Sequence, residues 1–142
     1  MPPPNRYRRQ EVLPEIGVEG QRKLAGARAV VVGLGALGSM SSDLLARAGV
    51  GHLRLVDRDV VELTNLQRQL LYSERDVDRP KAEAAAERLR SVNSEIEIEP
   101  VSKDVHSATV REILRDADVV VDGTDNLETR FLIGRASCRE RV

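Results

Sequence analysis

Glycines and a carboxylate whose spacing could bind a nucleotide stand in the first half of the chain. Gly33, Gly35 and Gly38 form the pattern Gly-x-Gly-x-x-Gly, which follows an apolar run and opens a helical pattern. There the first glycine permits a tight turn, the second lets phosphate approach the backbone, and the third lets helix and strand pack closely. The helix N-terminus offers free N–H groups to phosphate. Asp57 ends the next apolar run, where an acid can accept hydrogen bonds from ribose hydroxyls.

A second group of polar residues could bind the phosphates of that nucleotide. Asn65 and Gln67 supply neutral donors, and Arg68 supplies a forked cation that suits phosphate. Lys81 falls in the first turn of a helix expected to open at Pro80, where a cation opposes the helix dipole unless an anion lies nearby. Taken singly, Arg68 or Lys81 is better interpreted as a solvated surface cation, but together with the glycine loop they favour a phosphate site. The absence of a Gly-x-x-x-x-Gly-Lys-Ser/Thr motif excludes a phosphate-loop kinase.

A carboxylate in the second half of the chain suggests a metal ion. Asp125 and Asn126 follow the apolar run at 118–122 and are expected beside the glycine loop. A carboxylate close to a triphosphate repels it unless a cation mediates, so Asp125 indicates Mg²⁺. The alternative is that these residues cap a helix over 127–132, and capping can coexist with metal binding.

Alternating strand and helix patterns must position these residues. The continuous apolar strands are expected at the centre of a sheet, and the strand that alternates Glu and Ile nearer its edge. The alternation predicts an α/β fold, a Rossmann-like doubly wound and mainly parallel sheet, truncated after about the fourth strand. Expected strands are 29–32, 52–57, 95–99 and 118–122, and expected helices are 36–48, one opened by Pro80 with Asp78 as its cap, and 107–115.

Composition excludes several classes of protein. With 22 Lys and Arg against 23 Asp and Glu, the net charge is −1, which gives no general attraction to nucleic acid or to an anionic membrane. No apolar run approaches the ~20 residues of a membrane helix. The one cysteine excludes an internal disulfide and a cysteine-built zinc site in this chain. With no secretory signal at the N-terminus, these features predict a cytoplasmic protein without nucleic-acid or membrane partners.

Taken together, the motifs resemble the ThiF/MoeB/HesA family of adenylyltransferases, whose fold ubiquitin-activating enzymes share. The resemblance covers residues 6–132, and its specificity comes from the order of many motifs. They are RYRRQ at 6–10, GVEGQ at 17–21, GLGALG at 33–38, AGVG at 48–51, LVD at 55–57, NLQRQ at 65–69, PK at 80–81 and TDN at 124–126.

The resemblance implies an activity and a role for each matching residue. Members bind MgATP and direct the C-terminal glycine carboxylate of a ubiquitin-like sulfur carrier, ending in Gly-Gly, at the α-phosphate; an acyl-adenylate and pyrophosphate result. It also implies a homodimer in which Arg9 reaches the partner subunit's nucleotide site. Within one subunit it implies phosphate contacts from the backbone of Gly35 and Ala36, ribose binding by Asp57, triphosphate binding by Asn65, Arg68 and Lys81, and Mg²⁺ binding by Asp125 with Asn126 beside it.

The sequence departs from the family pattern in two places. Ala36 replaces a frequent glycine, a mild change because the backbone N–H is the group used. Residues 133–142 do not continue the pattern expected from the resemblance and can be encoded by a common sequencing-adapter sequence, so we expect a non-native tail. We therefore expect a disordered start at 1–5, a partial ATP-binding domain at 6–132, and any family zinc site beyond this chain. Two alternatives stay open: an NAD-dependent oxidoreductase, and a non-catalytic nucleotide-binding or dimerisation module.

Overall fold

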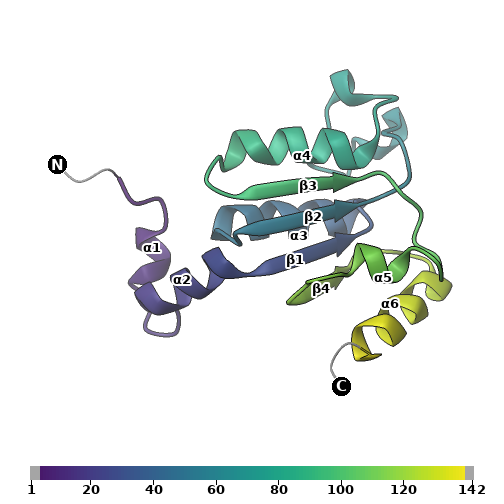
Figure 1. Cartoon of the computed structure of the whole chain (residues 1–142). Helices are drawn as coiled ribbons and strands as arrows, with labels where there is room; N and C mark the ends of the chain where they lie inside the picture. The colour runs from purple at the N-terminus through teal and green to yellow at the C-terminus, as the bar shows by residue number, and fades with distance from the viewer. Residues whose placement is uncertain (1–3, 140–142) are drawn as a thin grey trace.

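A parallel four-stranded sheet forms the centre of the protein. The computed structural model describes residues 4–139, with side chains through residue 137. The strand order is β3-β2-β1-β4, with β1 at Arg28–Val32, β2 at His52–Val56, β3 at Glu97–Val101 and β4 at Val119–Asp122. All four strands end on the same side of the molecule (Figure 1). The predicted doubly wound α/β architecture is confirmed.

Helices cover both faces of this sheet. Helices α3 (Ala36–Ala48) and α4 (Lys81–Val92) pack on one face, and α5 (Val110–Ile113) and α6 (Leu127–Arg139) pack on the other. Short α1 (Arg8–Glu11) and α2 (Gly17–Gly26) precede β1 and lie away from the ends of the strands (Figure 1). Two 3-10 turns, Leu63–Asn65 and Glu74–Asp76, connect β2 to α4. None of the helices in residues 4–139 is long and apolar enough to cross a membrane.

The apolar strands supply two cores because successive side chains of a strand point to opposite faces. Val31 and Leu55 face the α3 and α4 layer, where Leu89 joins them. Val32 and Val56 face the other layer with residues of α5 and α6. A strand covered on both faces needs apolar residues at consecutive positions, which explains the continuous apolar run of β1.

Several boundaries and positions differ from the predictions. We expected β4 to be central, but it pairs only with β1 among the described strands, and Val119 is 54% exposed. The edge position of β3 is confirmed, although the strand begins two residues later than expected, and α5 is shorter. The proposed cap at Asp78 is wrong: Pro80 occupies the N-cap of α4, and Asp78 adopts a left-handed φ of 68°.

Helix α3 turns small residues toward the sheet. Its buried residues are Gly38, Ser39, Ser42 and Ala46, which allow the helix to approach β1 closely. The apolar spacing of this segment puts Leu37, Met40, Leu44 and Leu45 on one helical face, but only Leu45 packs against the core, and the other three are exposed to solvent. Apolar periodicity therefore identified the helix correctly without identifying its buried side.

The two ends of the chain test the domain boundaries only in part. Residues 1–3, from the expected disordered start, and 140–142, from the expected non-native tail, lie outside the described residues. Asn5 accepts a hydrogen bond from the backbone N–H of Tyr7 at 2.9 Å. Helix α6 continues past residue 132, where we had expected it to end, and Ile133 is buried against α5. The origin of the tail stays a prediction.

Candidate nucleotide-binding site

A cleft of about 920 Å³ opens where β1, β2 and β4 end. Parallel strands bring their carboxyl ends to one edge, so loops that are distant in sequence meet there. The cleft collects all but three of the predicted site residues: Gly38 is buried behind it, Arg9 lies elsewhere, and the expectation that Gln67 supplies a donor is wrong, because Gln67 is exposed and does not line the cleft. Those lining it are Gly33, Gly35, Ala36, Asp57, Asn65, Arg68, Lys81, Asp125 and Asn126.

The glycine loop is shaped by close backbone packing. Gly33 has a φ of +86°, and a Cβ there would lie 2.9 Å from the carbonyl carbon of Gly123. A Cβ on Gly38 would overlap the carbonyl oxygen of Gly33. Gly35 differs: a Cβ there would meet only the Nε2 of Gln69, at 3.8 Å. The space in front of Gly35 is therefore open to a ligand, as predicted for a phosphate that approaches the backbone.

Helix α3 begins at this open space. Gly35 is its N-cap and provides no side-chain cap, so helical geometry leaves the first N–H groups without intrahelical partners. The N-terminus of this 13-residue helix carries the positive end of the helix dipole. The loop can thus offer donors and a favourable potential to an anion.

Asp57 holds the glycine loop in place. Its Oδ2 accepts a hydrogen bond from the backbone N–H of Leu34 at 2.8 Å, and its Oδ1 accepts one from Asp59 N–H at 2.8 Å. Each carboxylate oxygen has two lone pairs, so acceptor capacity remains for a ribose hydroxyl. From the other side, the Tyr72 hydroxyl donates to the Leu34 carbonyl at 2.9 Å. Burial, assisted by the charge of Asp57, raises the pKa of Tyr72 and keeps this donor protonated.

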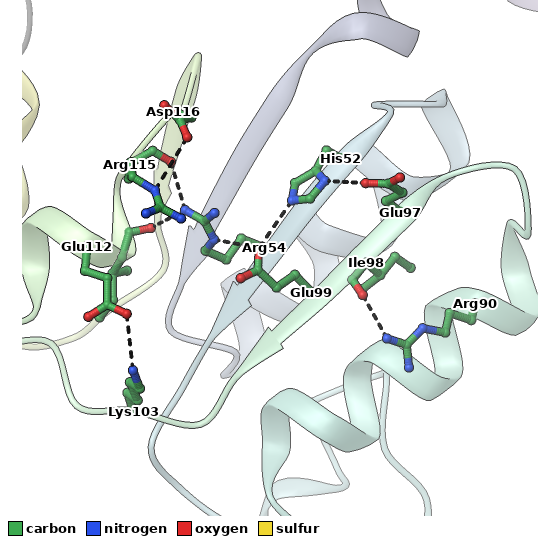
Figure 2. Close-up of polar contacts among 11 residues, drawn as sticks. His52, Arg54, Arg90, Glu97, Ile98, Glu99, Lys103, Glu112, Arg115 and Asp116 are labelled. Carbon is green, nitrogen blue, oxygen red and sulfur yellow. Dashed lines mark hydrogen bonds and ion pairs between the residues drawn. The ribbon is translucent and has the colours of Figure 1, made fainter.

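Four cationic side chains line the cleft, and two of them are paired. Arg58 lies 3.4 Å from the carboxylate of Asp104. Lys103 lies 3.5 Å from Glu112, and Figure 2 draws this pair. Within residues 4–137, Arg68 and Lys81 have no carboxylate partner. Lys81 is 7% exposed, so a cation is held in the cleft wall without a counter-charge.

Two side chains from the segment after β2 complete this wall. The Oδ1 of Asn65 accepts a hydrogen bond from the backbone N–H of Glu62 at 2.9 Å, which fixes the first 3-10 turn. Gln69 is 4% exposed and lines the cleft one helical turn further along. Sequence reasoning did not assign Gln69 a role; its spacing of four from Asn65, which puts both on one side of a helical turn, was the available signal.

The loop after β4 presents Asp125 to the cleft. Asn126 caps α6, because its Oδ1 accepts hydrogen bonds from the N–H groups of Glu128 and Thr129 at 2.9 and 3.3 Å. Asp122 accepts from Thr124 Oγ1 at 2.6 Å and from Arg130 Nε at 3.0 Å. Although burial opposes its charge, these bonds hold the pKa of Asp122 below its ordinary value.

The carboxylate of Asp125 fits the requirements of a nucleotide-bound Mg²⁺. Asp125 is exposed and lines the cleft, and it makes no hydrogen bond to the side chains or backbone of residues 4–137. These described residues contain no cluster of three or more potential metal ligands. Mg²⁺ commonly takes one or two carboxylates and completes its shell with substrate phosphates and water, so one free carboxylate suffices.

A charged network on the sheet binds the end of α5, which follows another part of the cleft wall (Figure 2). Residues 103–107 form this wall and lead into α5. Arg54, 9% exposed at its side chain, donates to the carbonyls of Ile113 and Arg115 at 2.7 and 2.9 Å and to Glu99 at 2.8 Å. His52 lies between Glu97 and Glu99, with its two ring nitrogens at 3.0 and 3.3 Å from their carboxylates. His106 lies on the cleft wall.

Arg9 lies outside the cleft. It is exposed on α1, which precedes the sheet on the side away from the strand ends (Figure 1). The fold of this chain therefore does not bring Arg9 to its own glycine loop.

Comparison with known proteins identifies the family. The ThiF family profile matches residues 7–142. The chain is 49% identical over 139 residues to the sulfur carrier protein ThiS adenylyltransferase of Bacillus subtilis, and 46% identical over 129 residues to the SAMP-activating enzyme E1 of Haloferax volcanii. These matches cover 96% and 91% of this chain but 41% and 48% of the relatives, so the chain spans under half of their length.

Solved structures agree with the sequence comparison. The Escherichia coli tRNA N6-threonylcarbamoyladenosine dehydratase TcdA, solved in complex with ATP, is similar with a TM-score of 0.84 and 31% identity. That match covers 89% of this chain and 52% of the other. Escherichia coli MccB with AMPCPP also gives a TM-score of 0.84 at 31% identity, over 98% of this chain and 43% of MccB. The chain belongs to the ThiF family.

Proposed function

We propose that this chain supplies the nucleotide site of an enzyme that adenylates the C-terminal glycine of a ubiquitin-like sulfur-carrier protein, using MgATP and releasing pyrophosphate. The observation that carries the proposal is Lys81, a cation held in the cleft wall at 7% exposure with no carboxylate partner among the described side chains. A buried charge is costly unless it is compensated, so the position calls for an anionic ligand. The names of the relatives and the ATP complex of TcdA favour ATP over a nicotinamide cofactor.

In this proposal, each part of ATP is bound by a group of the cleft. The N–H groups at the start of α3 and the side chains of Asn65, Arg68 and Lys81 bind the phosphates, and Asp57 accepts from the ribose. Asp125 holds Mg²⁺, which when bound neutralises phosphate charge. The attacking carboxylate is already ionised, so no protein nucleophile or base is required. Catalysis then depends on holding two anions together and on compensating their charge.

The same proposal includes a homodimer in which Arg9 acts across the interface. Arg9 is exposed on α1 and distant from its own cleft, so a partner subunit is the route by which it reaches a phosphate. A two-fold interface would complete both sites at once.

The test compares two lysines of the same cleft. Lys81 is unpaired among the described side chains, whereas Lys103 is exposed and paired with Glu112. We expect MgATP to raise the melting temperature of the parent and of Lys103→Met, and to raise that of Lys81→Met much less. A longer protein that contains this chain and spans the length of its relatives should exchange pyrophosphate into ATP only with a carrier that ends in Gly-Gly.

Three results would count against the proposal. Protection by NAD with none by ATP would favour an oxidoreductase. Equal protection of the two lysine variants would remove Lys81 from the phosphate site. Nucleotide binding without carrier-dependent exchange in the longer protein would favour a non-catalytic nucleotide-binding module.

A further inference from the structure

The side chain of Gln69 is buried without a hydrogen-bonding partner. The residue is 4% exposed, and its Oε1 is the one buried side-chain polar atom without a hydrogen bond among the described residues. Its Nε2 makes no hydrogen bond to the described part of the chain either, although the backbone N–H of Gln69 bonds to Asn65 at 2.9 Å. Packing, rather than hydrogen bonding, therefore holds this carboxamide in position.

Such an arrangement is costly for the folded protein. A buried polar group without a partner loses its interactions with water and gains none in exchange. An apolar side chain of similar shape, such as methionine, would avoid this cost. An amide that lowers stability while lining a binding cleft is the pattern expected where binding requires the residue.

The free end of the amide faces the phosphate-binding part of the cleft. The Nε2 lies 3.8 Å from the position of a Cβ built on Gly35, and Gly35 is the N-cap of α3. A group in the open space before Gly35 would thus be within reach of both the α3 N-terminus and the Gln69 amide. Both present N–H donors, so the ligand atom must be an acceptor, and the helix dipole favours an anionic one.

We propose that the Nε2 of Gln69 donates a hydrogen bond to an anionic phosphate oxygen of the nucleotide, beside the N–H groups of α3. The inference rests on the proposed function and adds to it a neutral donor that neither charge nor the glycine pattern revealed. Unlike Arg68 and Lys81, the Gln69 amide is neutral and adds no net charge to the site. Because the packing around it fixes the amide, it favours a phosphate oxygen in one direction.

Gln69→Met tests the proposal because binding and folding should change in opposite directions. We expect the variant to melt at the same temperature as the parent or higher without ligand, since the orphaned oxygen is removed. Its dissociation constant for ATP should rise roughly tenfold to a hundredfold, the usual effect of a hydrogen bond to a charged group. Binding of adenosine, which has no phosphate, should stay unchanged. Gln67→Met is the matched control, because Gln67 is exposed in the same segment.

Several outcomes would overturn the proposal. Unchanged ATP binding by Gln69→Met would show that the amide has no ligand, and equal loss of ATP and adenosine binding would assign it to pocket shape. If the methionine variant does not fold, the same comparison of ATP binding with adenosine binding is made with Gln69→Leu. A parent chain that binds no ATP would instead refute the proposed function, a result distinguishable from the first two because there the parent binds.

Discussion

Replacement of Asp57 by alanine should weaken both the fold and nucleotide binding, and the two effects can be separated. The carboxylate accepts hydrogen bonds from Leu34 N–H and Asp59 N–H, each at 2.8 Å. Leu34 is fully buried, so its N–H would lose its partner at a cost of roughly 1–3 kcal/mol, whereas water can replace the bond at exposed Asp59. Asp57→Ala should therefore lower the free energy of unfolding by about that amount, measured by urea denaturation.

The expected effect on nucleotide binding comes from the proposed contact between Asp57 and the ribose. A hydroxyl that donates to a carboxylate contributes roughly 1.5–3 kcal/mol, so the dissociation constant for ATP should rise about tenfold to a hundredfold. Calorimetry with ATP and with 2′,3′-dideoxy-ATP separates the loss of the ribose hydrogen bond from any disturbance of the glycine loop. The parent should prefer ATP, whereas Asp57→Ala should bind the two nucleotides alike. The reasoning is refuted if the variant keeps the parent's preference, because the ribose hydroxyls would then bind elsewhere.

Three further predictions test the loop, acid stability and the dimer. Gly38→Ala should destabilise the chain by about 3 kcal/mol or more in urea unfolding, since its Cβ meets backbone; Gly26→Ala, with open space at that position, should change little, and equal effects would contradict the packing argument. Burial opposes the charge of Asp76, but hydrogen bonds from Ser73 and the charges of Arg79 and Arg75 outweigh it and hold the pKa of Asp76 below its ordinary value. The contribution of Asp76 to the free energy of unfolding is therefore present above about pH 4 and is lost as the pH falls through the pKa of the folded state. Asp76→Asn should thus flatten the loss of unfolding free energy between about pH 5 and pH 3, and identical pH profiles would exclude this role. In the longer protein, Arg9→Ala and Lys81→Ala should each be nearly inactive in pyrophosphate exchange and regain activity when mixed; no recovery in proven heterodimers would place Arg9 outside the partner's site.

Local patterns predicted those parts of the fold that depend on neighbouring residues. The glycine loop, α3 and β1 followed from spacing and from β-branched residues, because turn geometry and burial on both faces constrain consecutive positions. The edge position of β4 could not be read in this way. Its apolar run resembles that of β1, and the difference lies in which strands pair with it.

The candidate site was predictable as a set of residues but not as a set of contacts. The order of the motifs predicted that Asp57, Lys81 and Asp125 lie together, and all three line one cleft. The sequence did not reveal that Asp57 also fixes Leu34, or that Lys81 differs from Lys103 in lacking a partner among the described side chains. These properties depend on which side chains meet after folding, and neither residue type nor spacing specifies them.

The pairing of β4 with β1 implies an order of folding. β1 pairs with β2 between Arg28 and His52, but it pairs with β4 between Ala29 and Val119, which closes a far longer loop. The added closure entropy is about 1 kcal/mol, so we expect β4 to dock after the β1–α3–β2 unit. Substitutions at Val121 should then accelerate unfolding and leave the folding rate nearly unchanged, and slower folding would reverse this order. Asp125 lies three residues after the end of β4, so we expect the cleft to acquire this carboxylate in the last folding step, and a nascent chain can form the glycine loop before Asp125 joins it.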